Sequence, residues 1–396
     1  MVELKLLNLT YSINHKMKYC NKCIIPETRP DQFFNKDGVC NACESYELRK
    51  EIDWDKRFND LKEIINKIKD KSGKWDCVIP SSGGKDSTYQ AIRARELGLN
   101  PVVVTSTTCD LSDLGKKNIT NLKNLGFDTF EVSPNPIVRA KLNKLCLEEI
   151  GDIAWPEHVS IFTIPIRFAL NQKIPMILWG ENPQFEYGGP AEKIHSNILD
   201  RVWLEEFGGL LGMRVSDLID TYGFESKYYY PYNYPTAQEL SEFNVIGLFL
   251  GYYEPWDNLR NAEISKKNGF FTFNKPIENG YLDSEKLDNH QHGIHDYFKF
   301  LKYGFGRATD QLSLMIRRDL ISRVEALDLV KKHEGKFPLS YLDKSLEEIL
   351  KKIDMPLAEF KKICDKFTNK KLFECNQANE LIKDKFGNLT LKKIDN

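Results

Sequence analysis

The chain has 396 residues, of which 41% are hydrophobic, and its 56 lysines and arginines nearly balance its 57 aspartates and glutamates. This length can bury two or three domain cores, and the near-neutral charge argues against a protein that holds long nucleic acids through a basic footprint. The sequence shows neither a run of about eighteen apolar residues nor a secretory leader, so we expect a cytoplasmic protein with no membrane partner.

Four of the nine cysteines form a pattern near the start of the chain. They make two C-x2-C pairs separated by sixteen residues, which is the spacing of a four-thiolate zinc site, and they are Cys20, Cys23, Cys40 and Cys43. Free thiols or two disulfides are the alternatives, but a segment so poor in apolar side chains needs a metal to fold. The sequence therefore predicts a structural zinc ribbon over residues 17–55.

Residues 1–16 precede a second methionine, Met17, and we expect them to be a flexible extension. Either Met1 or Met17 could be the biological start. After the ribbon, residues 56–70 carry apolar side chains on one helical stripe, which predicts a surface helix that links the ribbon to a core.

A glycine-containing loop at residues 80–88 reads Pro-Ser-Ser-Gly-Gly-Lys-Asp-Ser-Thr. It follows an apolar run at 77–79 and opens a helical segment that reaches Leu97, so it lies where a strand hands over to a helix N-terminus. Glycines allow a phosphate to approach the backbone, and the helix dipole with Lys85 adds positive charge. The spacing differs from that of a Walker loop. A plain serine and glycine turn before a helix is the alternative.

Short apolar runs alternate with helical segments from residue 75 onward, which predicts an α/β fold with a parallel sheet covered by helices. The runs are 77–79, 102–104, 127–132 and 176–179. Ligands of such sheets bind beyond the carboxyl ends of the strands, so the loop, Thr105–Thr108 and Gly180-Glu181-Asn182 are expected in one crevice. Residues 183–289 show no long periodic pattern, and we expect loops and short elements that shape a substrate pocket.

The pattern is helical from residue 290 to 364. One apolar stripe ends near Gly335 and consists of Ile316, Leu320, Ile321, Val324, Leu327 and Val330. Arg317 and Arg318 are expected on a solvated helix face. His290, His292 and His295 are interpreted as pocket lining rather than as metal ligands.

The loop resembles the pyrophosphate loop of the N-type ATP pyrophosphatases. Together with the cysteine pattern, Gly180-Glu181-Asn182-Pro183 and the run from His295 to Gln311, it resembles the N-acetyl sugar amidotransferase family of bacterial nonulosonic acid and lipopolysaccharide sugar biosynthesis. The resemblance implies an ATP pyrophosphatase core of the adenine nucleotide alpha hydrolase type at 56–289. A helical C-terminal region would follow at 290–396.

That family is understood to adenylate an acetamido group of a sugar and to replace its oxygen with ammonia, releasing AMP and pyrophosphate. The resemblance implies ATP-binding residues Ser81, Ser82, Gly83, Gly84, Lys85, Asp86, Ser87, Thr88, Thr105 and Gly180. Lys85 would offset the charge of pyrophosphate and Asp86 would hold Mg²⁺, while Glu181 and Asn182 would line the nucleotide or the reacting amide. Arg307 and Asp310, at a glycine-rich helix entry, would bind a sugar carboxylate or phosphate.

The chain has neither an N-terminal cysteine nor a Gly-x-Cys-x-Gly elbow, so we expect ammonia from a separate glutaminase. The resemblance suggests one like the glutaminase and cyclase pair of imidazole glycerol phosphate synthase. A tRNA thiolation enzyme is the main alternative, in which Cys77, Cys109 and Cys146 would have to converge. A non-catalytic zinc-ribbon scaffold is the second. The sequence leaves the sugar open among pseudaminic-type, legionaminic-type and nucleotide-linked uronic acids.

Overall fold

A parallel β-sheet forms the centre of the molecule. The computed structural model describes residues 17–69, 73–181, 213, 215–223, 225–243 and 245–392. Within them the sheet has the order β3-β2-β1-β4-β5, and every neighbouring pair is parallel. The strands are β1 (Cys77–Pro80), β2 (Pro101–Ser106), β3 (Asp128–Val132), β4 (Met176–Trp179) and β5 (Ile246–Phe249). The chain winds outward in both directions from β1, so a crevice is expected between the loops that follow β1 and β4. The predicted α/β fold with a parallel sheet is confirmed.

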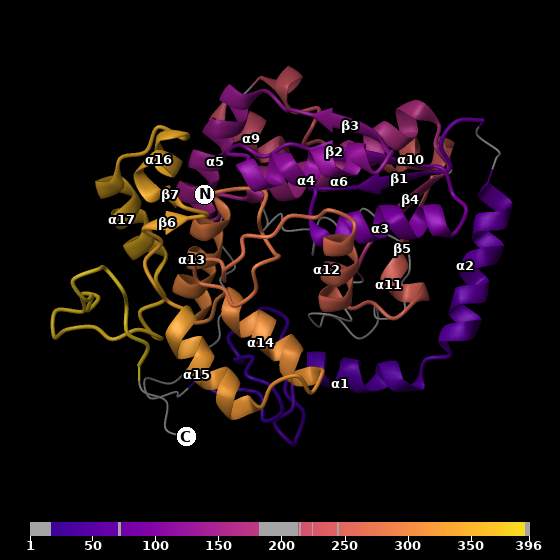
Figure 1. Ribbon diagram of the computed structural model, residues 1–396. Coiled ribbons are helices and arrows are strands. Elements are labelled where there is room, and N and C mark those ends of the chain that lie inside the picture. The colour runs from indigo at the N-terminus through magenta and orange to yellow at the C-terminus, as the bar shows by residue number, and fades with distance from the viewer. Residues whose placement is uncertain are drawn as a thin grey trace.

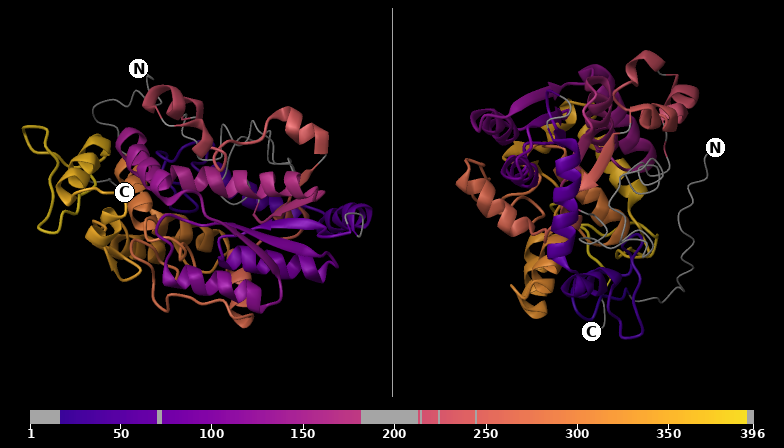
Figure 2. Two further views of the ribbon diagram at one scale, coloured as in Figure 1. Left: turned by 90° about the horizontal axis from the view of Figure 1, so that it is seen from above. Right: turned by 90° about the vertical axis from the view of Figure 1, so that its right-hand side faces the viewer.

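Helices cover both faces of this sheet, as Figure 2 shows from above. On one face, alternate strand residues such as Val78 and Val102 pack against α6 (Trp155–Gln172). On the other face, Ile79 and Val103 pack against α3 (Lys85–Glu96), and residues of α2 (Trp54–Ile68) and α4 (Asp113–Asn124) join the same core. Because both faces are buried, β1, β2 and β4 read as continuous apolar runs, which is why the sequence revealed them.

The segment predicted as loops and short elements holds a regular strand and helix that the sequence missed. β5 reads Ile-Gly-Leu-Phe, and Gly247 interrupts its apolar run, whereas its neighbour β4 is apolar at all four positions. The missed helix is α12 (Asn258–Lys267), which packs along α3 and positions side chains beside the glycine loop. Further elements around the core are α5 (Pro136–Ile150), α9 (Val215–Tyr222), η3 (Ser226–Tyr228), α10 (Ala237–Phe243), α11 (Leu250–Tyr253) and α12 (Asn258–Lys267).

The cysteine segment is packed into the C-terminal helices instead of standing apart. Ile24 and Ile25 share one apolar cluster with Leu312 and Ile316 of α14 (Arg307–Arg317). Figure 1 shows this segment beside α14 and α15 (Arg323–His333), with α1 (Asn41–Leu48) and the turn η1 (Arg49–Glu51) leading on to α2. Residues 1–16, predicted to be a flexible extension, lie outside the described residues.

The single helical stripe predicted through residues 316–330 is wrong. α14 ends at Arg317, and Asp319 adopts a left-handed φ of 55° before Ser322 and Glu325 form the capping box of α15. The break turns two stripe residues outward, because Leu320 is 56% exposed and Val324 is 72% exposed. A chain reversal of this kind leaves the apolar period nearly intact, so periodicity alone does not detect it.

The remaining C-terminal elements build a second core around α13 (His292–Tyr303). They are β6 (Ser340–Tyr341), β7 (Lys344–Ser345), α16 (Leu346–Lys351) and α17 (Leu357–Phe367). Phe298 of α13 packs against Phe360 and Phe367 of α17. None of the helices in the described ranges combines the length and the apolar character needed to cross a bilayer.

Candidate functional site

The glycine loop lies at the carboxyl edge of the sheet, between β1 and α3. Its start is fixed by the Ser81 amide, which donates to Val104 of the neighbouring strand at 3.0 Å. The Ser81 hydroxyl accepts from the Gly83 amide at 2.9 Å and donates to Ser87 at 2.9 Å, which closes the loop over the first turn of α3. No side chain caps α3, because its N-cap is Gly84. The first-turn amides therefore face outward, as an anion site requires.

The two glycines of the loop do different work. Gly83 has a left-handed φ of 77°, and an added Cβ would lie 2.9 Å from Ile119 Cγ1, so both its backbone and its packing require glycine. Gly84 has an ordinary φ of −72°, and an added Cβ would meet only the Ser82 hydroxyl at 3.2 Å. Gly84 is thus free of structural need in this state, which is the property expected where a ligand approaches the backbone.

Lys85 and Asp86 start α3 and face a carboxylate that the sequence did not single out. Lys85 is 5% exposed and forms an ion pair with Asp86, while its Nζ lies 3.5 Å from Glu285 Oε1. Burial alone would lower the pKa of Lys85, but the charges of Asp86 and Glu285 outweigh it and raise that pKa. The ammonium therefore stays protonated in a site of low polarity.

Asp86 keeps access to solvent. Its side chain is 30% exposed, and Asn261 of α12 donates to its Oδ1 at 3.0 Å. The Ser265 hydroxyl, one turn further along α12, donates to the Lys85 carbonyl at 2.7 Å. An ordered, partly open carboxylate is a suitable ligand for a hard cation such as Mg²⁺. Within the chain both oxygens of Asp86 already have a partner, Lys85 and Asn261, so the binding of Mg²⁺ by Asp86 stays a prediction.

Other predicted nucleotide-binding residues lie at the same edge. The hydroxyls of Thr88 and Thr105 are buried and have no hydrogen-bond partner within the described part of the chain. Gly180 follows β4, and an added Cβ would lie 2.9 Å from Trp256 and 3.0 Å from Gln90 of α3. The charge of Glu181 acts on Lys85.

Asn182, also predicted here, lies outside the described residues. The structure thus brings the loop together with the ends of β2 and β4, as the sequence analysis expected. Which of these groups bind a nucleotide stays a prediction.

Arg307 and Asp310, the predicted sugar-binding residues, are both engaged within the chain. Arg307 holds Asp296 through two hydrogen bonds of 2.8 and 3.1 Å, so its fork is filled. Asp310 accepts from Arg29 of the cysteine segment at 2.9 Å and pairs with Lys299. Their role toward a substrate stays a prediction. Within the chain, Arg307 joins α14 to α13, and Asp310 joins α14 to the cysteine segment.

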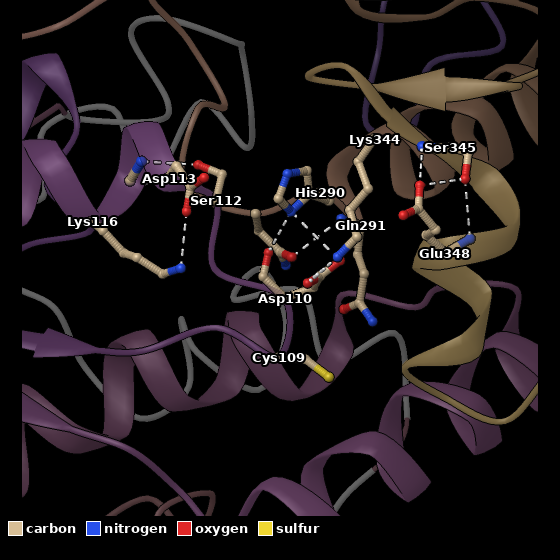
Figure 3. A network of polar contacts seen from close by, with 12 residues as sticks. Cys109, Asp110, Ser112, Asp113, Lys116, His290, Gln291, Lys344, Ser345 and Glu348 are labelled. Atoms are coloured by element: carbon tan, nitrogen blue, oxygen red, sulfur yellow. Dashed lines mark hydrogen bonds and ion pairs between the residues drawn. The ribbon is translucent and has the colours of Figure 1, made fainter.

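The three predicted pocket-lining histidines each contact a different acidic residue. His290 lies against Asp110, His292 Nε2 lies 3.1 Å from Asp288, and His295 Nδ1 lies 2.7 Å from Asp152. Figure 3 shows Asp110 between His290 and Lys344 of β7, whose Nζ lies 2.7 Å from both Asp110 oxygens. The Asp110 contacts join the C-terminal region to the segment that follows β2, and the Asp152 contact joins it to the segment that follows α5. The Asp288 contact lies within the C-terminal region itself.

The four-cysteine site is compact and closed. All four sulfur atoms lie within 4.8 Å of one another, and each cysteine is 0% exposed. The distances of 3.9 Å between Cys20 and Cys43 and 3.7 Å between Cys23 and Cys40 match the ~3.8 Å separation of tetrahedral ligands at a Zn–S length of about 2.3 Å. The predicted convergence is confirmed, and the set can hold a structural zinc ion.

Backbone amides and one arginine surround these sulfurs. The Cys23 and Cys43 amides donate to Cys20 and Cys40, each at 3.4 Å. Arg317 is 4% exposed and its Nη1 lies 3.8 Å from the Cys23 sulfur. The predicted solvated face is wrong for Arg317, and also for Arg318, whose side chain is 6% exposed beside Asp257.

The other cysteines do not assemble into a second thiol site. Cys77 lies in the core beneath the sheet, and Cys146 lies in a separate cluster beside Met213. Burial raises the pKa of Cys109 to about 12, which disfavours a reactive thiolate. In the described ranges, the four ribbon cysteines are the only group of three or more potential metal ligands.

Sequence reasoning missed Glu285, Asn261 and Ser265. All three belong to the stretch that was predicted as loops, and none is part of a motif. Their only sequence signal is that α12 carries polar residues four apart, Asn261 and Ser265, on a helix with few apolar positions. Such a pattern is ordinarily a solvated face, and only packing against α3 turns it toward the loop.

Comparison with known proteins links the chain to lipopolysaccharide biosynthesis. Residues 268–386 match the family described as LPS biosynthesis protein WbpG-like, C-terminal domain. This stretch holds α13 through α17 and includes Glu285, Arg307 and Asp310. The match covers 119 of the 396 residues, and over that stretch the chain is similar to this lipopolysaccharide biosynthesis domain. None of the curated proteins matches the chain significantly.

Proposed function

We propose that the chain is an ATP-dependent amidotransferase that converts an acetamido group of a bacterial lipopolysaccharide sugar into an acetamidino group. The observation that carries the proposal is the glycine loop at the N-terminus of α3, with Lys85 and Asp86 inside it and Glu285 facing them. Glu285 belongs to the stretch that matches the lipopolysaccharide biosynthesis family. The proposed anion site and the stretch that is similar to a lipopolysaccharide biosynthesis domain therefore meet at Lys85 and Glu285, which supports the proposal.

The chemistry gives each part of the site a task. The amide oxygen attacks the α-phosphate of ATP, and pyrophosphate leaves with the bonding electrons of the P–O bond. Ammonia then adds to the activated carbon, a proton is lost, and AMP departs to leave the amidine. Such phosphoryl transfers depend on positioning and charge neutralisation.

In this proposal the glycine loop supplies both the positioning and the charge neutralisation. The first-turn amides of α3 and the hydroxyls of Thr88 and Thr105 are donors for phosphate oxygens, and Lys85 neutralises the charge that grows on pyrophosphate. Asp86, supported by Asn261, would hold Mg²⁺. Held there, the ion would neutralise part of the negative charge of the phosphates.

The site fits a tRNA thiolation enzyme less well. That chemistry would call for cysteines near the nucleotide, but Cys77 and Cys146 lie in separate cores and Cys109 has a raised pKa. We therefore carry the amidotransferase proposal alone to experiment.

The test is a product assay on the purified chain with ATP, Mg²⁺, concentrated ammonium chloride and a panel of acetamido sugars. We expect AMP and pyrophosphate in equal amounts, dependent on the sugar and accompanied by a mass decrease of about one unit as O is replaced by NH. Release of AMP with bulk tRNA and a sulfur donor, but with no sugar, would contradict the proposal.

The same assay tests the proposed ammonia source. We expect turnover with ammonium at raised pH and none with glutamine, because the sequence holds no glutaminase nucleophile in a recognised setting. Addition of a glutaminase partner should then restore the use of glutamine. Efficient glutamine-dependent turnover by this chain alone would contradict the need for a partner.

A further inference from the structure

The Glu285 carboxylate lies near the Lys85 ammonium but is set back from it. Glu285 Oε1 is 3.5 Å from Lys85 Nζ, whereas a hydrogen bond between an ammonium and a carboxylate has a length of about 2.7–2.9 Å. Asp86 pairs with the same nitrogen at 2.5 Å. The two carboxylates therefore act differently on the lysine, because Asp86 binds the ammonium and Glu285 only faces it.

Two neutral side chains hold Glu285 in this position. Gln311 Nε2 of α14 donates to Glu285 Oε2 at 2.8 Å, and Asn258 Nδ2 of α12 donates to Glu285 Oε1 at 3.0 Å. Burial raises the pKa of Glu285, but the charges of Lys85 and Arg307 outweigh burial and lower that pKa. The carboxylate is therefore ionised, and both of its amide donors are closer to it than the ammonium is.

Gln311 is fixed in one orientation by the backbone of a neighbouring turn. Its Oε1 accepts from the Tyr281 amide at 2.7 Å and from the Leu282 amide at 3.1 Å. Because the oxygen of the carboxamide must face these two donors, its nitrogen must face Glu285. Gln311 is also 2% exposed, so water competes little for either end of the carboxamide.

The turn of α14 that carries this glutamine is itself anchored. The Thr309 amide donates to Glu334 at 2.8 Å, and Arg29 of the cysteine segment donates to Asp310 at 2.9 Å. A support that is anchored in this way keeps its position when the ammonium beside the carboxylate moves.

We propose that Gln311 is a positioning residue that holds the Glu285 carboxylate away from Lys85, so that the ammonium can turn to a phosphate oxygen of ATP or pyrophosphate. The proposal rests on the proposed function for the identity of this ligand. Without the donor from Gln311, the ionised carboxylate would move onto the cation with which it already pairs, and it would compete with phosphate for that cation. Gln311 thus acts on the affinity for a ligand that it does not touch.

The decisive variant is Gln311→Glu. It keeps an oxygen for the Tyr281 and Leu282 amides, so the turn is preserved, but it replaces the donor to Glu285 with a second carboxylate. Repulsion between the two carboxylates should press Glu285 toward Lys85. The exchange variant, Gln311→Glu with Glu285→Gln, restores a pair of one amide and one carboxylate and places the amide beside the lysine.

Two further variants complete the set. Gln311→Met removes the donor without adding a buried charge, so it carries the test if Gln311→Glu does not fold. Gln238→Glu is the matched control, because Gln238 Nε2 also donates to a glutamate, Glu242 Oε1, at 2.9 Å. Gln238 is exposed on α10, which packs against α6.

Calorimetric titration with inorganic pyrophosphate at constant Mg²⁺ measures the affinity without sugar and without turnover. We expect Gln311→Glu to raise the Kd about tenfold, and Gln311→Met to raise it by about threefold or more. The exchange variant should return to within about twofold of the wild type, and Gln238→Glu should leave the Kd unchanged. In the turnover assay the KM for ATP should follow the same order.

The same titration distinguishes failure of this inference from failure of the proposed function. An unchanged Kd in Gln311→Glu would overturn the inference, and so would an exchange variant that binds as weakly as Gln311→Glu. Wild-type protein that binds neither ATP nor pyrophosphate would overturn both. The expected series of affinities in a protein that forms no AMP with any acetamido sugar would contradict the reaction but support the role of Gln311.

Discussion

The glycine loop and the four-cysteine site both come from short motifs, but they differ in what they leave open. At the cysteine site every sulfur is buried and lies close to the other three, and the sulfurs of Cys20 and Cys40 accept from nearby amides. At the loop, Thr88 and Thr105 have hydroxyls without described partners, and Asp86 is 30% exposed. A closed set of ligands stabilises the fold, whereas unfilled polar groups beside a helix N-terminus can bind a substrate.

The two sites also differ in what they contribute to the free energy of unfolding. A buried polar group without a partner costs about 1–3 kcal/mol, so the open hydroxyls of the loop lower stability until a ligand binds. A zinc ion bound by the four cysteines would stabilise the cysteine segment and also α14, which packs against that segment in the apolar cluster that contains Leu312. Substitutions at the two sites should therefore separate stability from activity.

The largest effect is expected at the cysteine site. Cys40→Ser removes one of four thiolates, and the free energy of unfolding should fall by about 4 kcal/mol with loss of zinc. Thermal melting with metal analysis measures both. Cys375→Ser, outside the cluster, is the control and should change neither. A metal-free wild-type protein that melts at the same temperature would contradict a structural zinc.

The next largest effect is expected at Asp86, mainly on the rate of AMP formation. Asp86→Asn keeps the shape of the side chain and removes the charge that would hold Mg²⁺, so AMP formation should fall about 10²- to 10³-fold, or about 3–4 kcal/mol. The fold should survive because Glu285 still faces Lys85, although loss of the Asp86 charge beside the buried ammonium should lower the melting temperature. Asp113→Asn is matched, because Asp113 also lies in the first turn of a helix after a strand but is 90% exposed. Near-normal turnover of Asp86→Asn would contradict a role of the glycine loop in the reaction.

The site around Glu334 is a closed polar site without metal, and the pH dependence of its contribution to stability extends the comparison. Glu334 is partly buried and accepts from the Thr309 amide at 2.8 Å and from the Thr309 hydroxyl at 2.9 Å, at the start of α14. Burial raises the pKa of Glu334 from 4.5 to about 7. The stability that the protonated carboxyl contributes is thus fully present below pH 4.5 and is lost as the pH rises to about 7.

This loss should amount to about 3 kcal/mol across that window. Glu334→Gln cannot ionise, so its unfolding free energy should fall less than that of the wild type over the same range. Glu347→Gln, at an exposed position, is the control and should follow the wild-type profile. Identical profiles for wild type and Glu334→Gln in urea unfolding would show that Glu334 does not titrate there.

The smallest effect lies within the loop itself. Gly83→Ala forces a side chain into a φ of 77° against Ile119 and should cost about 1–2 kcal/mol of stability. Gly84→Ala meets only a hydroxyl that can rotate, so melting should change little while the KM for ATP rises. Equal destabilisation by the two substitutions would contradict a structural role for Gly83 and a binding role for Gly84.

The sequence by itself determined the local features of this protein. These features are the cysteine spacing, the glycine loop and the apolar runs of β1, β2 and β4. Each lies within a short stretch of the sequence, so its backbone geometry and side-chain chemistry can be predicted without the rest of the chain. The meeting of the loops that follow β1, β2 and β4 also followed, because parallel strands place their following loops at one edge. The convergence of the four cysteines and the position of Lys85 at the start of a helix were therefore predictable.

Only the tertiary structure decided which distant residues complete these sites. Glu285 reaches Lys85 across two hundred residues of sequence, Arg317 turns inward to the cysteines, and Asp296 fills the fork of Arg307. Each of these contacts depends on how α12, α13 and α14 pack, and a charged residue on a helix carries no local sign of the partner it will meet. Long-range electrostatic pairing is set by packing, and periodicity and motif spacing do not encode it.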